Sequence, residues 1–316
     1  MSFRRAGFVA LCVFVLLLPG CHRNHANQKR LIDIIVPSQD NPFFRAEADA
    51  AAQRATELGY AVRVESHDDD AYAQDNLIDV AIASNAAAII LDNAGADASV
   101  SAVRRATRAG IPCFLIDREI STPNIAKAQI IADNDQGARL VAAEFARALN
   151  GSGAYAELLG KESDTNAQVR TSGFHAVLDK DKGMKLVSAQ SANWSQSEAF
   201  QKTETILQAH AEIQGIIAGN DTMALGAVAA VKSAGRHNIT IVGFDGSPDA
   251  LAAIKAGDLD ATVLQPAVAI ARLAVEEADQ FLRTGMTNPS EHQVIPCELV
   301  TKQNADQFGV FERKSN

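Results

Sequence analysis

A carboxylate and a guanidinium, Asp117 and Arg118, stand directly after the short apolar stretch Cys113 to Ile116. This stretch predicts a buried strand, because a short apolar run among alternating strands and helices suits a parallel sheet covered on both faces. In open α/β sheets, the ligand crevice lies outside the carboxyl ends of the strands. The pair therefore stands where a ligand is expected, although an ion pair that only caps the strand accounts for the same two residues.

Polar and aromatic side chains follow other predicted strands in the same way. They are Asn41, Phe43, Phe44 and Asp92 before Asp117, and Arg170, Trp194, Asn220, Phe244, Asp245 and Gln265 after Arg118. Charged planar groups form paired hydrogen bonds with neighbouring hydroxyls, and aromatic rings pack on the C–H faces of a sugar ring. A structural role explains each residue alone, such as a helix cap or a core ring. It does not explain their joint occurrence, which suits a small uncharged ligand with many hydroxyls.

The elements that must position these residues alternate between strand and helix. The first series of strands covers 31–36, 61–65, 87–91, 113–116 and 128–131, and the second covers 154–159, 185–189, 215–218, 240–242 and 261–264, with a last strand at about 293–299. A helix separates most neighbouring strands, and one of these helices is expected over 168–178. The pattern predicts an α/β fold with two doubly wound parallel-sheet lobes and right-handed crossovers.

The N-terminus reads as a targeting segment. Arg4 and Arg5 precede the apolar run Gly7 to Leu18, which is too short to span a bilayer comfortably. The sequence Leu18-Pro19-Gly20-Cys21 resembles a bacterial lipoprotein processing site, in which Cys21 is lipidated. Ordinary secretory cleavage nearby is the alternative. We therefore expect residues 1–30 to form a signal peptide and tether, and the mature protein to lie in the periplasm or cell envelope, touching the membrane only through this anchor.

Composition narrows the classes of function. The 316 residues are 47% hydrophobic and 21% charged, which is ordinary globular usage, and the net charge of −9 argues against a nucleic-acid partner. Cys113 and Cys297 lie inside predicted strands, as buried free cysteines commonly do. The spacing of Cys and His suggests no metal site, and no cofactor is expected.

Six motifs carry a family resemblance. They are Asn41-Pro42-Phe43-Phe44, Ile116-Asp117-Arg118, Arg170-x-x-Gly173-Phe174, Asn220-Asp221-x-Met223-Ala224-Leu225-Gly226, Val242-Gly243-Phe244-Asp245-Gly246 and Gln265. With these motifs in order, the chain resembles the type I periplasmic sugar-binding proteins, and among them the ribose-binding protein group, over Leu31 to Gln303. The resemblance implies the periplasmic binding protein-like I fold, in which a ligand is held between two lobes that close on a hinge.

The resemblance also implies roles for individual residues. Ring stacking falls to Phe43 or Phe44 and to Trp194, and hydrogen bonding falls to Asn41, Asp117, Arg118, Arg170, Asn220, Asp245 and Gln265. Pro37, Ser38 and Trp194 differ from the ribose-binding pattern. The expected ligand is therefore a small sugar or polyol, without ribose being specified.

Three chain crossings should join the lobes, near Ala132-Asp133, Gln265-Pro266 and Pro296-Cys297. The expected N-terminal lobe comprises 31–132 plus 266–296, and the C-terminal lobe 133–265 plus 297–316. The expected function is an exported, monomeric solute-binding protein that captures its ligand between the lobes and delivers it to an ABC permease. A sugar-binding protein that serves a chemoreceptor would use the same closed form.

An enzyme that acts on sugars is the alternative from a different class. The sequence lacks a nucleophile elbow, a P-loop and a dinucleotide-binding glycine motif. Asp117 and Asp245 could in principle act as a carboxylate pair. A nearby arginine is expected to hold each of them ionised, which does not suit a general acid. A sugar-operon repressor is disfavoured because a signal segment occupies the place of its helix-turn-helix.

Overall fold

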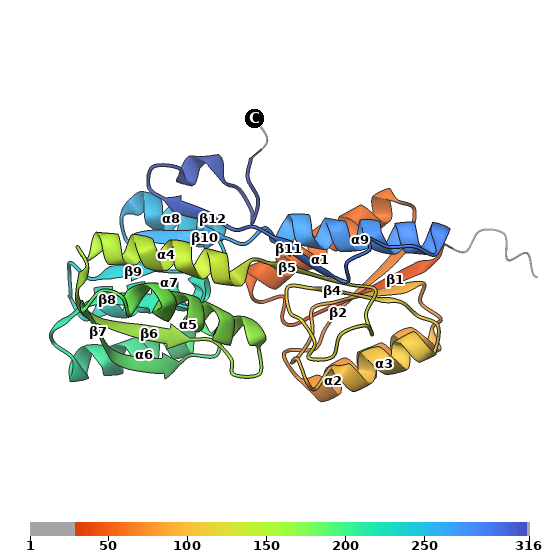
Figure 1. Cartoon of the computed structure of the whole chain (residues 1–316), viewed down its shortest axis with the longest axis horizontal. Helices are drawn as coiled ribbons and strands as arrows, with labels where there is room; N and C mark the ends of the chain where they lie inside the picture. The colour runs from red at the N-terminus through yellow and green to blue at the C-terminus, as the bar shows by residue number, and fades with distance from the viewer. Residues whose placement is uncertain (1–28, 315–316) are drawn as a thin grey trace, which may run out of the picture.

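The computed structural model describes residues 29–314, which form two α/β lobes side by side (Figure 1). The sheet of the first lobe is parallel throughout. Its strands in spatial order are β11 (His292–Ile295), β5 (Ala128–Ala132), β4 (Cys113–Ile116), β3 (Ala88–Leu91), β1 (Leu31–Val36) and β2 (Ala61–Ser66). Its helices are α1 (Pro42–Glu57), α2 (Ala71–Ala83), α3 (Val100–Arg108) and α9 (Ala267–Thr284). Helices α1 and α9 cover one face of the sheet, and α2 and α3 cover the other.

The second lobe repeats this plan. Its strands in spatial order are β12 (Glu298–Thr301), β10 (Ala261–Leu264), β9 (Thr240–Val242), β8 (Ile213–Ala218), β6 (Ser152–Leu159) and β7 (Gly183–Ser191). Its helices are α4 (Asn134–Ala148), α5 (Thr165–Leu178), α6 (Gln196–Ala209), α7 (Asp221–Ser233) and α8 (Pro248–Ala256), with a 3-10 turn η1 (Ala305–Gln307) near the end. The predicted pair of parallel-sheet lobes is confirmed, except that the edge strand β12 runs antiparallel to β10.

Several strands lead into a helix through a loop that ends in a capping residue. Asn41 accepts a hydrogen bond from the backbone of Phe43 at the start of α1, where Pro42 occupies the first turn. Asp164 and Asn220 cap α5 and α7 in the same way. The caps fix the loops at the carboxyl ends of the strands, and those loops face the other lobe.

The chain passes between the two sheets three times. The passages lie between β5 and α4, between β10 and α9, and between β11 and β12. The single last strand predicted over 293–299 is wrong, because Pro296 and Cys297 separate β11 from β12 and the two strands join different sheets. Proline lacks the backbone N–H that a continuing strand needs, so the ladder stops there.

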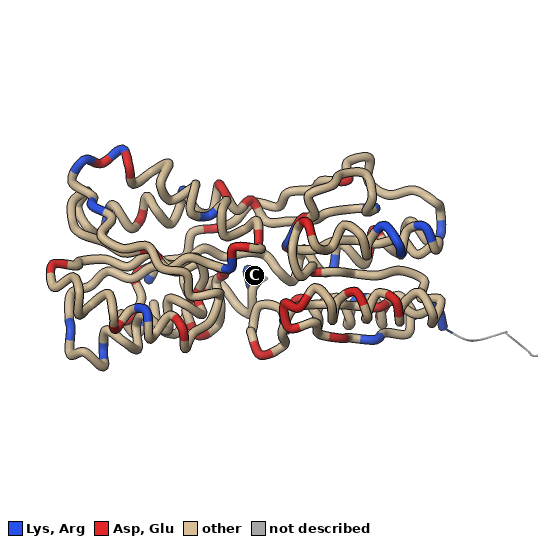
Figure 2. Tube along the Cα trace, turned by 90° about the horizontal axis from the view of Figure 1, so that it is seen from below, with Lys and Arg blue, Asp and Glu red and all other residues tan. Residues whose placement is uncertain are grey.

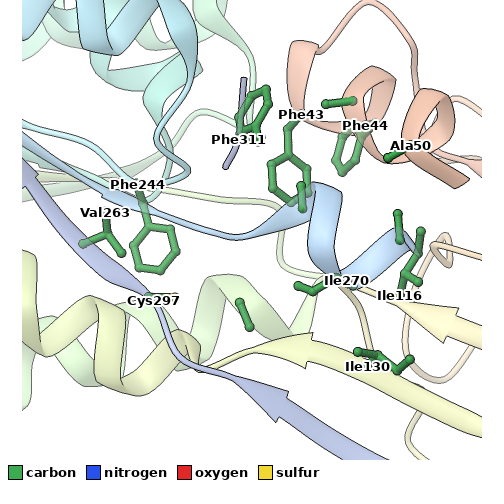
Figure 3. Packing of buried hydrophobic residues seen from close by; sticks show 14 of the residues in the cluster. Phe43, Phe44, Ala50, Ile116, Ile130, Phe244, Val263, Ile270, Cys297 and Phe311 are labelled. Carbon is green, nitrogen blue, oxygen red and sulfur yellow. The ribbon is translucent and has the colours of Figure 1, made fainter. Parts of the chain in front are cut away.

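One buried apolar cluster continues through the passages from lobe to lobe (Figure 3). Phe43 packs edge-on against both Phe44 and Phe311, with 5.5 Å between the ring centroids of Phe43 and Phe311. Phe244 lies beside Cys297 and Val263 on the second-lobe side. The crossings are therefore packed segments rather than free linkers.

The described part of the chain, residues 29–314, has no helix that combines the length and apolar character needed to cross a membrane. Lys and Arg are interspersed with Asp and Glu on both lobes in the view of Figure 2. The predicted targeting segment, including Cys21, lies outside the described residues.

Candidate ligand-binding site

A cavity lies between the lobes. Its lining residues are Asn41, Phe43, Phe44, Asp117, Arg118, Asp164, Asn166, Arg170, Trp194, Asn220, Asp245 and Gln265. Most of these side chains are buried. The fold thus brings residues from the first loop, the ends of both sheets and one crossing to a single enclosed space.

Three residues of this wall have an unusual backbone conformation. Asp117, Trp194 and Asp245 have φ values of 58°, 64° and 122°, which L-residues rarely adopt. Aspartate tolerates the left-handed region better than a bulky residue does, so Trp194 is the least expected of the three. Such conformations persist where the surrounding contacts enforce them, and they often occur at ligand sites.

Arg170 is the centre of hydrogen bonding in the second lobe. Its guanidinium donates to Asn134 Oδ1 at 2.8 Å, to the carbonyl of Gly219 at 2.8 Å and to Gln265 Oε1 at 2.5 Å. The Nη1 atom also lies 3.3 Å from Asp245 Oδ1. Beneath it, the Phe244 ring centroid is 3.9 Å from Arg170 Cζ. These contacts fix the guanidinium plane at the cavity wall.

Arg118 occupies the corresponding place in the first lobe. It donates to Asp69 Oδ1 at 2.7 Å and to the carbonyl of Asn93 at 3.0 Å. Its Nε atom lies 2.8 Å from Asp164 Oδ2 in the second lobe and 3.5 Å from Asp92 Oδ1. The Nη2 atom is buried and has no hydrogen-bond partner. An unpaired buried donor is costly, so this N–H is suited to a hydroxyl oxygen of a ligand.

Asp117 is bonded from the other side of the cleft. Gln265 Nε2 donates to Asp117 Oδ1 at 2.9 Å, and Asn166 Nδ2 donates to the same oxygen at 3.2 Å. Because Asn166 belongs to α5 of the second lobe, these bonds form only when the lobes are together. The other carboxyl oxygen, Asp117 Oδ2, takes part in neither of these two hydrogen bonds.

Burial controls the protonation of the wall carboxyls. Desolvation, followed by repulsion from Asp164, raises the pKa of Asp117 to about 6, and attraction to Arg118 opposes the shift. Desolvation also raises the pKa of Asp245 well above its usual range, with the attraction of Arg170 opposing it. Burial therefore works against the arginine at each carboxyl, although a pKa of about 6 leaves Asp117 mostly ionised at neutral pH.

Trp194 lies flat against the backbone of the second lobe. A methyl group at Gly160 would lie 2.0 Å from Trp194 Cη2, and one at Gly219 would lie 3.0 Å from Cζ3. The indole Nε1 donates to Asp164 Oδ2 at 3.1 Å. Two glycines and one carboxylate thus hold the indole ring at the cavity wall.

The structure places three residues differently from the sequence analysis. Phe244 does not line the cavity, because its fully buried ring packs beneath Arg170. Asp164 and Asn166 line it although sequence reasoning missed them. Helix α5 begins at Thr165, three residues before the expected start, and Asp164 is its N-cap. The sequence signal for this cap was Asp164 itself, because aspartate is a preferred residue directly before the first turn of a helix.

The sequence matches a known family over most of the described chain. Residues 32–285 match the periplasmic binding protein domain. A D-apiose import binding protein of Paraburkholderia graminis is 55% identical, covering 90% of this chain and 92% of that protein. A D-apiose import binding protein of Actinobacillus succinogenes is 53% identical, and the match covers 89% of this chain and 91% of that protein. A ribose import binding protein of Bacillus subtilis is more distant. It is 32% identical, and the match covers 88% of this chain and 93% of that protein.

Solved structures agree on the fold. An ABC transporter solute-binding protein of Bacillus halodurans with bound myo-inositol superposes with a TM-score of 0.83 at 28% identity. The match covers 88% of this chain and 96% of that one. From its two-lobed fold and its sequence, the chain belongs to the periplasmic binding protein family.

Proposed function

We propose that this protein captures a small sugar between its lobes for import by an ABC permease, and that the sugar is D-apiose. The observation that carries the proposal is the enclosed inter-lobe cavity, which presents guanidinium, carboxyl and amide groups beside aromatic rings. Two curated relatives above 50% identity are both named for D-apiose import. D-apiose is a branched pentose, and its several hydroxyls match the donors and acceptors of this wall.

The chemistry of the cavity wall favours a small polyhydroxyl ligand, because charged and amide groups stand beside aromatic rings. The buried Arg118 Nη2 supplies a donor for a hydroxyl oxygen, and the carboxyl of Asp117 would supply an acceptor for a hydroxyl hydrogen. An anionic ligand is disfavoured by the many carboxyls that surround the cavity.

Capture would occur by closure of the two lobes on a hinge. We assign 31–132 plus 266–296 to one lobe and 133–265 plus 297–316 to the other, with the hinge at the three passages. A ligand that contacts Asp117 and Arg118 on one side and Arg170 and Asp245 on the other binds the closed state more tightly. That difference shifts the population toward closure.

The test is a binding screen with the purified mature protein. D-apiose should raise the melting temperature and D-ribose should raise it less, because a ligand specific for the folded state stabilises it by about 4 kcal/mol at a thousandfold over its Kd. Small-angle scattering should show a smaller radius of gyration with sugar than without it. Absence of binding by D-apiose, D-ribose and myo-inositol would overturn the proposal.

A second measurement separates binding from catalysis. Sugar released from the denatured complex should be chemically unchanged, as expected of a carrier. A product recovered in place of the added sugar would instead support the enzyme alternative. The same buried carboxyls could serve either role, so the released compound decides between them.

The location follows from the N-terminal segment. We propose that residues 1–20 direct export, that Cys21 carries a lipid, and that residues 22–30 tether the monomeric protein beside its permease. The short polar stretch from His22 to Lys29 suits a tether because it lacks an apolar repeat.

A further inference from the structure

Two carboxyl groups beside the cavity have an unusual environment. Glu47, on the inner side of α1, is fully buried, and so is Asp92 at the end of β3. None of their four carboxyl oxygens accepts a hydrogen bond from a donor in the described chain. Glu47 and Asp92 are close enough to repel each other when both are charged, and Asp92 Oδ1 lies 3.5 Å from Arg118 Nε. Neither lines the cavity, so neither is explained by direct contact with the sugar.

We propose that Glu47 and Asp92 share one proton and, as a pair with a single negative charge, hold Arg118 in position for the sugar. Two ionised carboxylates are both acceptors and cannot bond to each other. A proton on one of them makes their contact a hydrogen bond and removes the repulsion between two buried like charges. The same arrangement leaves one negative charge to face the guanidinium.

The charges around the pair favour a shared proton. The titratable and charged groups that surround it are His67 and Asp69 after β2, Asp117 and Arg118 after β4, and Asp164 from the second lobe. Arg118 is the only guanidinium in this group, against several carboxyls. Burial, ahead of repulsion from Asp92 and Asp117, raises the pKa of Glu47 well above its usual range. Burial likewise raises the pKa of Asp92, although Arg118 opposes it.

His67 does not neutralise the pair. Its Nε2 atom lies 2.8 Å from the backbone carbonyl of Asp92, and its Nδ1 atom accepts from the backbone N–H of Asp69 at 3.1 Å. This arrangement matches the neutral tautomer with the proton on Nε2, and burial lowers the pKa of the ring. Arg118 is therefore the cation nearest the pair in the described chain, and the pair in turn restrains it.

The role in sugar binding rests on the proposed function, whereas the shared proton does not. Arg118 is held by Asp69 on one nitrogen and faces Asp92 with another, which leaves Nη2 for the ligand. Removing the proton-sharing partner would leave Asp92 as a lone buried charge. Asp92 would then draw Arg118 toward itself and away from the cavity.

Infrared difference spectroscopy of the sugar-free protein tests the shared proton. At neutral pH, Glu47→Gln should lose the C=O stretch of one protonated carboxyl relative to wild type. Glu57→Gln is the matched control on the same helix, because Glu57 is paired with Arg54 at the surface. It should lose only an ionised-carboxylate band. An unchanged protonated-carboxyl signal in Glu47→Gln would overturn the proposal.

Calorimetry with D-apiose tests the positioning role. Glu47→Gln keeps a donor toward Asp92 without a titratable proton, so its Kd should stay within about threefold of wild type. Glu47→Leu should weaken binding at least tenfold. At alkaline pH, wild type should lose affinity as the shared proton leaves, while Glu47→Gln should not. Equal alkaline profiles for wild type and Glu47→Gln would refute the positioning role even if Glu47→Leu fails to fold. Failure of wild type to bind D-apiose would count against the proposed function and leave the infrared result standing.

Discussion

Arg118 of the first lobe and Asp164 of the second form an ion pair across the closed cleft, with 2.8 Å between Arg118 Nε and Asp164 Oδ2. Both side chains are almost completely buried. The same Asp164 oxygen accepts from the indole of Trp194. One carboxylate therefore connects the two lobes, the stacking ring and the cavity wall, and it can do so only in the closed form.

Replacing Asp164 with alanine should weaken sugar binding by about tenfold to a hundredfold, because a hydrogen bond to a charged group contributes roughly 1.5–3 kcal/mol. Isothermal calorimetry measures the change. Glu162→Ala, at an exposed position two residues earlier, is the control and should bind like wild type. Equal affinities for the two variants would show that the cross-lobe pair does not stabilise the closed complex.

Replacing Arg170 with alanine should reduce stability as well as affinity. The change leaves Asp245 buried without its cation and removes the donor to Gly219, and breaking a buried pair in this way costs about 3–5 kcal/mol. Urea unfolding of the sugar-free protein should show a lower midpoint. Arg139→Ala, which breaks an exposed pair on α4, should change the free energy of unfolding by less than about 0.5 kcal/mol. A wild-type midpoint for Arg170→Ala would contradict its role as a structural clamp.

Adding a methyl group at Gly160 should displace the indole ring without removing a charged group. The new carbon would overlap Trp194, and lost ring packing is worth roughly 0.5–1.5 kcal/mol, or about threefold to tenfold in Kd. Because the chain has one tryptophan, its emission reports the displacement directly. Gly309→Ala has ordinary room for a methyl group and is the control. Unchanged emission and Kd in Gly160→Ala would exclude a fixed indole at the wall.

The pH dependence of stability should depend on His175. A hydrogen bond with Glu157 is the main cause that raises the pKa of His175 to about 9. A raised pKa in the folded state stabilises the protein below the unfolded value of about 6.5, and this contribution disappears as pH rises toward 9. Wild type should therefore melt above His175→Gln at pH 6, with the gap closing by about pH 9. A gap that is constant with pH would contradict this assignment.

Replacing Cys21 with alanine should convert a membrane-associated protein into one that is not processed as a lipoprotein. Each buried CH₂ of a lipid chain contributes about 0.8 kcal/mol, and more than one chain gives stable attachment. Detergent partitioning and N-terminal sequencing of the mature protein provide the measurement. Recovery of wild type only in the soluble fraction, with its N-terminus beyond Cys21, would exclude the lipid anchor.

The two sheets and most of the cavity wall could be predicted because parallel strands end at one edge of a sheet. Asp117 and Arg118 follow β4 directly, and Asn220 and Asp245 come within three residues of the ends of β8 and β9, so the strand pattern places each pair at the edge of its sheet. The ring of Phe244 could not be placed in this way. A residue that follows a strand can point toward the cavity or into the core, and the ring of Phe244 packs in the core against the guanidinium of Arg170.

Other features depend on contacts distant in sequence. Glu47 lies on a helix whose sequence gives no sign that a carboxyl is buried, since its neighbour Asp92 comes from the loop after β3. Asp164 was missed because the start of α5 was placed too late. The break at Pro296 depends on which sheet each half of the last segment joins, and local propensity does not specify that choice.

The position of β11 has a consequence for how the chain folds. This strand pairs with β5, although the partners His292 and Gln129 lie more than half of the chain apart in sequence. Closing so long a loop costs entropy before any contact compensates it, and such topologies fold slowly. The first lobe to leave the ribosome cannot complete its own sheet until nearly the last residues have been added. Its edge at β5 stays unpaired during about half of synthesis, so the two lobes reach their native form together.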